Sequence, residues 1–131
     1  MISMTGNNTI RMDRQGSGKY GSRRKNRYHK GTDYVGKPGG FALAPISGKI
    51  LREAKPYANE DYSGFVIVGA TCSVKAFYFK LKRSLIGEQV KQGDPVGIIQ
   101  DISKKPGNEG MIPHIHQELI GGDLDIFVNG Y

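Results

Sequence analysis

The sequence predicts an all-β or β-dominated domain, and three observations support this. The apolar residues follow no 3.6-residue period over any long window, so no long helix is expected. They stand instead in short runs bounded by Gly and Pro, which is typical of strands joined by tight turns. Gly is unusually common, at 19 of 131 residues, and has no collagen-like period. A chain of this length fits one domain, residues 1–131, that can bury a core without disulfides.

Short apolar segments in chain order are the expected strands. They are Thr9–Asp13, Thr32–Val35, Phe41–Ala44, Gly48–Glu53, Phe65–Ala70, Val74–Lys82, Val96–Gln100, Ile112–Ile120 and Asp125–Val128. Turns are expected at Pro38–Gly40, Ile86–Glu88 and Gln92–Asp94, because each contains Gly next to a polar residue or Pro. Residues 16–27 form a basic loop rich in Gly and Ser, and residues 103–110 form a second loop. Residues 1–15 are expected to be an N-terminal extension or the first strand.

The charge is uneven along the chain. The net charge is +7, and residues 1–30 contain eight Lys and Arg residues against one acid, Asp13. A basic face attracts polyanions, so nucleic acid and the anionic polymers of bacterial cell walls are candidate partners, beside an ordinary solvated surface. Nucleic acid is disfavoured, because there is no known binding motif and aromatic residues do not interleave with the basic run.

The single cysteine and the apolar runs exclude other classes of protein. Cys72 cannot form an intramolecular disulfide and is expected to be a buried thiol in a strand. No apolar run approaches the ~18 residues needed to span a membrane. The N-terminus has no apolar signal region, so we expect a removed signal, another route of delivery, or no secretion.

The three histidines lie in two short motifs. His29 stands four residues before Asp33, and His114 and His116 stand two apart in one predicted strand, so they share a face. Each motif alone has an ordinary alternative, a surface ion pair or a coincidence of strand spacing. Together they indicate a metal site, because catalytic zinc takes three N or O ligands and leaves a fourth position to water. This donor set suits Zn²⁺ better than Mg²⁺, which prefers oxygen ligands.

Several blocks resemble motifs of the lysostaphin-type zinc endopeptidases, and they occur in the order found in that family. Residues 27–34 (RYHKGTDY) resemble its first zinc motif, and residues 44–50 (APISGKI) its A-P-x-x-G-x-V strand. Residues 87–97 (GEQVKQGDPVG) resemble its G-x-x-V-x-x-G segment, and residues 113–119 (PHIHQEL) its P-H-L-H-F-E strand. The resemblance extends from about residue 16 to the C-terminus.

The resemblance implies a fold, a reaction and site residues. The fold would be an antiparallel β-sheet with a groove walled by loops. His29, Asp33 and His116 would bind Zn²⁺, and His114 would contact the attacking water or the tetrahedral intermediate. The substrate would be a Gly-rich or D-amino-acid peptide of bacterial peptidoglycan, in the periplasm or cell wall. A phage tail or an injection machine could deliver such a protein without a signal peptide.

One position departs from the family pattern. A further catalytic histidine usually stands nine residues before the glycine that matches Gly87, and this chain has Tyr78 there. A tyrosine hydroxyl can donate a hydrogen bond to an oxyanion but is a poor base at neutral pH. The chain is also similar to the leukocyte chemotaxin branch of this fold, which has tyrosine at this place and is regarded as zinc-binding without peptidase activity. An inactive zinc module that binds wall or protein is therefore the alternative to an enzyme.

Two further expectations concern residues around the motifs. Glu118 shares the strand face of His116 and would either orient that ligand or form a surface ion pair. Tyr20 and Arg24 lie near the first motif in the sequence and are expected to line the groove.

Overall fold

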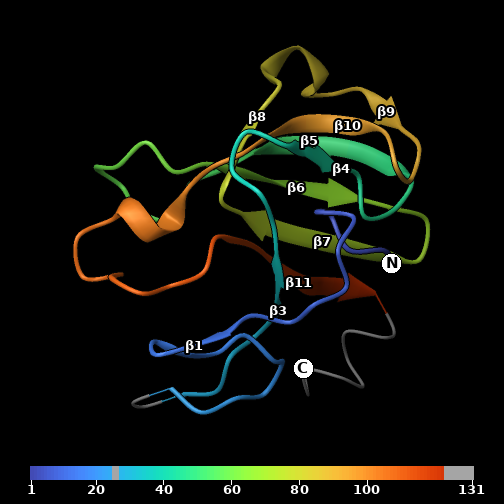
Figure 1. The fold of residues 1–131 in the computed structure, drawn as a ribbon. Helices are drawn as coiled ribbons and strands as arrows, with labels where there is room; N and C mark the ends of the chain where they lie inside the picture. Colours follow the sequence, from blue (N-terminus) through green and yellow to red (C-terminus); the bar gives the residue numbers. More distant parts are fainter. Residues whose placement is uncertain (25–26, 123–131) are drawn as a thin grey trace.

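A six-stranded antiparallel sheet forms the body of the protein (Figure 1). The computed structural model describes residues 1–24 and 27–122. In spatial order the strands of this sheet are β3 (Thr32–Val35), β11 (His114–Gly122), β7 (Cys72–Phe77), β6 (Gly64–Val68), β5 (Gly48–Ala54) and β9 (Gln89–Val90). Among the described residues the only helical segments are two 3₁₀ turns, Arg83–Leu85 and Ile102–Lys104. The β-dominated antiparallel fold predicted from the sequence is confirmed.

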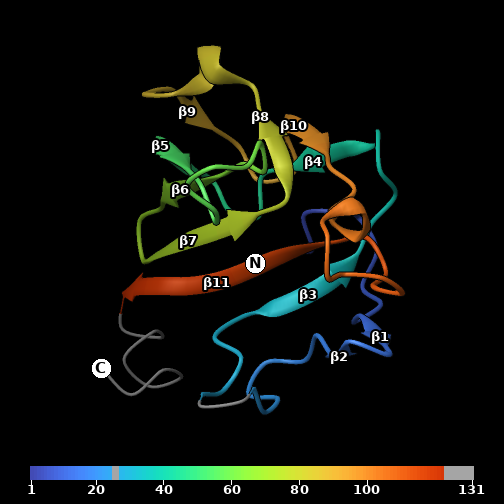
Figure 2. The same ribbon diagram turned by 90° about the vertical axis from the view of Figure 1, so that its left-hand side faces the viewer.

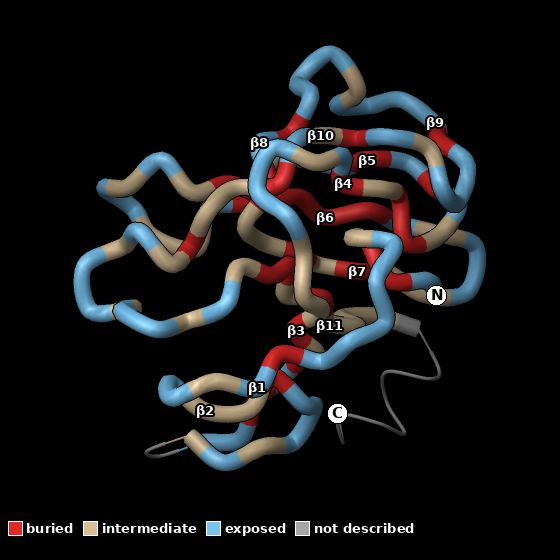
Figure 3. Tube along the Cα trace, viewed as in Figure 1, coloured by how far each residue is buried: buried red, intermediate tan, exposed pale blue. Residues whose placement is uncertain are grey.

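A three-stranded sheet packs against the large one and closes the core. It consists of β4 (Phe41–Leu43), β10 (Pro95–Ile99) and β8 (Phe79–Leu81), with β10 in the centre. Phe65 of β6 and Phe79 of β8 meet edge to face, with ring centroids 5.0 Å apart, and so join the two sheets. β6 is buried over most of its length, as Figure 3 shows, which explains its nearly continuous run of apolar residues.

A small hairpin lies at the opposite end of the molecule from the three-stranded sheet. Its strands are β1 (Met12–Asp13) and β2 (Gly16–Ser17), and Figure 2 shows it next to β3. The predicted strand Thr9–Asp13 is therefore mostly wrong, because only its last two residues are in a strand and Ile10 makes a single bridge to Tyr34. The predicted loop 16–27 begins with β2.

The first residues of the chain are tied to β11 by hydrogen bonds. The amide of Met4 donates to the side-chain oxygen of Gln117 at 2.6 Å, and the side-chain nitrogen of Gln117 donates to the carbonyl of Ile2 at 3.0 Å. Met4 is fully buried in the core. The N-terminal segment thus contributes to the core, whereas the sequence suggested only an extension or a strand.

The predicted strand Val74–Lys82 is wrong as one strand, since it breaks at Tyr78. Tyr78 has a φ of +86°, which for a residue other than Gly is strained. The amides of Tyr78 and Phe79 both donate to the carbonyl of Ser63, at 2.8 and 3.3 Å. The chain leaves the large sheet after β7 and enters the small one as β8, so Tyr78 is the pivot between the two sheets.

Other sequence expectations met different outcomes. The three predicted turns are confirmed, and each contains a glycine with positive φ. Cys72 lies in a strand as expected but is half-buried rather than buried. The predicted strand Asp125–Val128 lies outside the described residues. In the described part of the chain, no helix has the length and apolar character to cross a membrane.

Candidate metal centre

The pairing of β3 with β11 brings the two histidine motifs together. His116 lies opposite Asp33 in the register of these strands. His29 precedes β3 and is positioned by backbone bonds, since its amide donates to Ser22 and its carbonyl accepts from Gly21. Residues 87 positions apart in the sequence therefore meet at the end of the sheet.

Three side-chain atoms converge at this point. The Nε2 atom of His29 lies 3.0 Å from Nδ1 of His116 and 3.3 Å from Oδ1 of Asp33. Nδ1 of His116 lies 3.0 Å from the same carboxylate oxygen. His29, Asp33 and His116 are thus a group that could hold a metal ion.

In each of the three side chains, the polar atom that faces away from the candidate metal site contacts another group of the protein. His29 Nδ1 lies 3.2 Å from the carbonyl of Lys19, and His116 Nε2 lies 2.9 Å from Oε1 of Glu118. Arg11 Nε donates to Oδ2 of Asp33 at 3.2 Å. These partners place the ring protons on the outer nitrogens, so the inner nitrogens present lone pairs to each other. Two lone pairs at 3.0 Å repel unless a cation or a proton lies between them.

Burial and the neighbouring charged groups shift the pKa values of Asp33, His116 and Glu118 in opposite directions. Burial by itself would raise the pKa of the Asp33 carboxyl, but its close contacts with His116 and His29 hold this pKa well below its usual range. Burial opposes protonation of His116, but Asp33 and Glu118 outweigh it and raise the pKa of its ring. Burial likewise opposes ionisation of Glu118, and the bond to His116 together with the charge of Lys75 lowers its pKa. Asp33 and Glu118 are therefore both ionised at neutral pH, and their negative charge favours a cation at the inner ring nitrogens.

His114 lies beside the cluster and on the same face of β11 as His116, as the spacing predicted. Its Nδ1 lies 2.8 Å from the carbonyl of Ile112, and its Nε2 lies 3.6 Å from Oδ2 of Asp33. Burial lowers the pKa of this ring, so it is neutral at pH 7. With the proton on Nδ1, the Nε2 lone pair points towards the candidate metal site.

Tyr78 faces the same site from the pivot between the sheets. Its ring meets the ring of His114 edge to face at 5.3 Å, and its hydroxyl lies 3.3 Å from the hydroxyl of Tyr57. Burial and the hydrogen bond with Tyr57 raise the pKa of Tyr78 well above its usual value. The hydroxyl therefore stays protonated and can donate a hydrogen bond, but it cannot act as a base at neutral pH.

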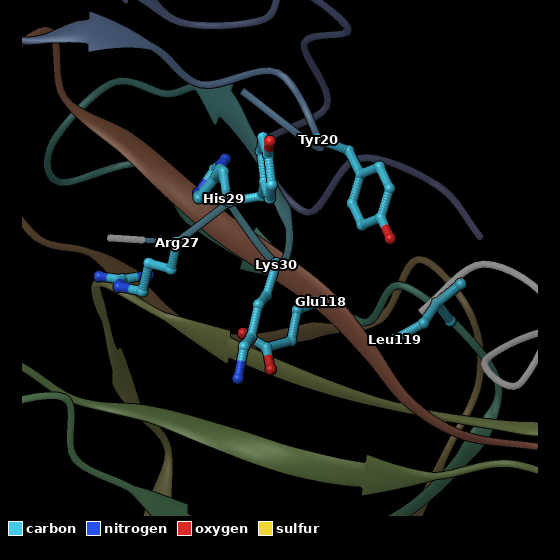
Figure 4. Close-up of a pocket in the computed structure, with 8 residues that line it drawn as sticks. Tyr20, Arg27, His29, Lys30, Glu118 and Leu119 are labelled. Carbon is cyan, nitrogen blue, oxygen red and sulfur yellow. The ribbon is translucent and has the colours of Figure 1, made fainter. Parts of the chain in front are cut away.

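A cleft of about 610 Å³ contains the cluster, His114 and Tyr78. Arg24 lines this cleft, as expected, and Tyr20 lines an adjoining groove of about 570 Å³, shown in Figure 4. His29 and Glu118 line both, so the two spaces meet beside the candidate metal site. Glu118 makes both of the contacts expected for it, because Oε1 contacts a ring nitrogen of His116 and Oε2 lies 3.8 Å from Nζ of Lys75.

Comparison with known proteins decides the family. The profile of peptidase family M23 matches residues 27–126, which is most of the chain. The chain belongs to peptidase family M23. It is 31% identical to mouse (Mus musculus) leukocyte cell-derived chemotaxin-2 over 119 residues, covering 88% of this chain and 76% of the relative.

Solved M23 structures share the fold. The catalytic domain of the prophage-encoded M23 protein EnpA from Enterococcus faecalis, solved as a point mutant, aligns with a TM-score of 0.60 at 22% identity. That alignment covers 86% of this chain and 81% of the EnpA chain. The catalytic domain of the antimicrobial peptidase lysostaphin from Staphylococcus simulans aligns with a TM-score of 0.56 at 21% identity, covering 84% and 80%. Members of family M23 are zinc metallopeptidases.

Within this M23 domain, sequence reasoning missed two residues of the site. Arg11 is buried and contacts Asp13 at 2.9 Å as well as Asp33, so it links the β1–β2 hairpin to the cluster. The i, i+2 spacing of Arg11 and Asp13 in a predicted strand was the available signal. Tyr57 carries no comparable signal, because it lies in a loop and meets Tyr78 only through the fold.

Proposed function

We propose that this protein is a zinc-dependent endopeptidase that cleaves peptide cross-links of bacterial peptidoglycan, and that residues 1–131 act as one domain. The observation that carries the proposal is the convergence of His29 Nε2, Asp33 Oδ1 and His116 Nδ1, each with its outer atom held by a partner. Tetrahedral zinc with bonds of about 2.0–2.2 Å has ligand atoms roughly 3.3–3.6 Å apart. The separations of 3.0–3.3 Å are slightly shorter, so a small outward movement of the side chains would accommodate this ion.

The residues around the ligands fit peptide hydrolysis. Zinc in such a site polarises the scissile carbonyl and lowers the pKa of a bound water. His114 accepts a proton at Nε2 from the attacking water and returns it to the leaving amine, while Ile112 holds the ring through Nδ1. Tyr78 donates a hydrogen bond to the developing oxyanion, which suits a hydroxyl that burial keeps protonated.

The comparisons support the substrate class and the place of action. The M23 family and the similarity to a peptidase domain favour peptidoglycan in the periplasm or cell wall. The similarity to a prophage-encoded protein supports delivery with a phage tail or an injection machine. The net charge of +7 favours contact with anionic wall polymers on the way to the substrate.

A non-catalytic zinc module is the second candidate, and Tyr78 favours it. Tyr78 stands where the family carries a histidine, and it cannot replace that histidine as a base. The identity of 31% to leukocyte cell-derived chemotaxin-2 supports the same alternative. In this function zinc would stabilise the fold, and the cleft would bind wall peptide or a protein without turnover.

Release of peptides from purified peptidoglycan tests the two candidates. We would incubate zinc-loaded protein with walls of several types, and assay zinc content and circular dichroism alongside. Asp33→Ala removes a proposed ligand, and Asp61→Ala is the matched control, because that side chain is 82% exposed. Peptide release by the wild type and Asp61→Ala only would support the enzyme. Stoichiometric zinc without release from any wall would refute it and favour the module, and a folded protein without zinc would refute both.

A further inference from the structure

Positive charge dominates the lining of the cleft. Among the described lining residues, six are Lys or Arg and only two are carboxylates, Asp33 and Glu118. The cations are Arg11, Arg24, Arg27, Lys30, Lys55 and Lys75. Both carboxylates are already engaged, Asp33 by Arg11 and the histidines, and Glu118 by His116. The excess of cations is therefore not neutralised by the acids that line the cleft.

Two of these cations stand where the cleft opens into the adjoining groove. Arg27 and Lys30 line both spaces, together with His29 and Glu118, and Figure 4 shows them around the ribbon of β11. Both residues are exposed, and both lie within residues 27–34, the first metal-binding motif. A peptide that runs from the candidate metal site into the groove must pass them.

A third cation approaches the same point from the next strand. Lys75 of β7 lies with Nζ 3.8 Å from Oε2 of Glu118. Glu118 is the one carboxylate among the described residues of this junction, and its other oxygen bonds His116. The junction, defined as Arg27, Lys30 and Lys75 around Glu118, thus keeps a positive excess beside the metal-binding atoms.

We propose that the junction binds a carboxylate of the substrate, so that this protein selects peptides with a free carboxylate near the scissile bond over neutral, glycine-rich cross-bridges. The proposal rests on the peptide-binding function proposed above. A positively lined cleft concentrates anionic ligands, and a carboxylate accepts charge-assisted hydrogen bonds from Lys and Arg. A glycine bridge offers only neutral backbone groups, whose hydrogen bonds to these side chains are weaker than those of a carboxylate.

Binding of two matched peptides to zinc-loaded protein tests the proposal through affinity, a measurement separate from turnover. One peptide carries a free side-chain carboxylate, and the other carries a carboxamide at the same place. Calorimetric titration should show tighter binding of the carboxylate peptide at about 50 mM salt, and a smaller preference at about 300 mM. Arg27→Gln and Lys30→Gln should each weaken that binding about two- to five-fold and leave the carboxamide peptide unchanged. Lys91→Gln, at an exposed turn outside the cleft, should alter the affinity for neither peptide.

Several outcomes would overturn the proposal. These are equal affinity for the two peptides, no binding of either by folded zinc-loaded protein, or equal weakening of both by Lys30→Gln. A phosphate polymer that binds more tightly than the carboxylate peptide, with the same loss in Lys30→Gln, would reassign the junction to polyanions. Carboxylate-selective binding without cleavage would support the carboxylate-binding junction and refute the endopeptidase function. Cleavage of both peptides with equal KM would support the endopeptidase function and refute the carboxylate-binding junction.

Discussion

Replacing Glu118 by alanine should weaken zinc binding about 10- to 100-fold. Oε1 of Glu118 lies 2.9 Å from Nε2 of His116, and its side chain is only 14% exposed, so water cannot fully substitute for this bond. The bond keeps the ring proton on Nε2 and the lone pair on Nδ1, which faces Asp33. Partners of this kind typically contribute a factor of 10–100 in metal affinity, equivalent to about 1.4–2.7 kcal/mol.

The glutamine variant separates charge from orientation. Glu118→Gln retains an acceptor oxygen for the ring proton but loses the charge, which roughly halves the strength of such a bond. We therefore expect a loss of zinc affinity of less than about tenfold, between those of the wild type and Glu118→Ala. Competition with a chromophoric chelator at pH 7 measures the zinc affinity of all three proteins. Glu88→Gln, at an exposed turn, is the matched control. Wild-type affinity in a folded Glu118→Ala would show that this carboxylate does not orient His116.

Three further predictions address the oxyanion donor, the backbone near the ligands and the hairpin. Tyr78→Phe should lower kcat about 10²- to 10³-fold with zinc content unchanged, and an unaltered peptide-release rate would exclude the hydroxyl from catalysis. Gly31→Ala should destabilise the fold by about 1–3 kcal/mol, because the added Cβ would lie 2.5 Å from the carbonyl oxygen of Gln117; wild-type urea denaturation would contradict this. Asp13 has a lowered pKa, although burial opposes this, through bonds from Ile112 and Gln15. The ionised Asp13 therefore adds to the free energy of unfolding above the ordinary aspartate pKa, and this contribution is lost as the pH falls through the lowered pKa. Asp13→Asn should therefore cost about 1–3 kcal/mol at pH 7 and progressively less below pH ~3.9, and an equal cost at pH 3, measured by urea denaturation, would refute the linkage.

Local sequence patterns predicted the parts of the site that depend on short spacings. The strand Thr32–Val35 has the predicted bounds, because apolar and polar residues there are flanked by clear turn residues. His114 and His116 point to one side because side chains two apart in a strand share a face. Such features need only the geometry of one strand.

Contacts between distant segments decided the rest, because register is not encoded in local periodicity. The pairing of β3 with β11 sets His116 opposite Asp33, while contacts with Lys19 and Glu118 favour the nitrogen of each ring that faces inward. The break at Tyr78 arises because the chain must pass from one sheet to the other, which a continuous strand pattern does not reveal.

The sequence by itself thus determined the strand-rich class, the turns and the donor residues of the candidate site. Only the tertiary structure decided how Asp33 and His29 are held, through Arg11 and a backbone carbonyl, whereas the contact of Glu118 with His116 was one of the two roles expected from their shared strand face. The physical reason is that a metal site needs side-chain positions accurate to a fraction of an ångström, and long-range packing and hydrogen bonds, rather than residue type, supply that accuracy.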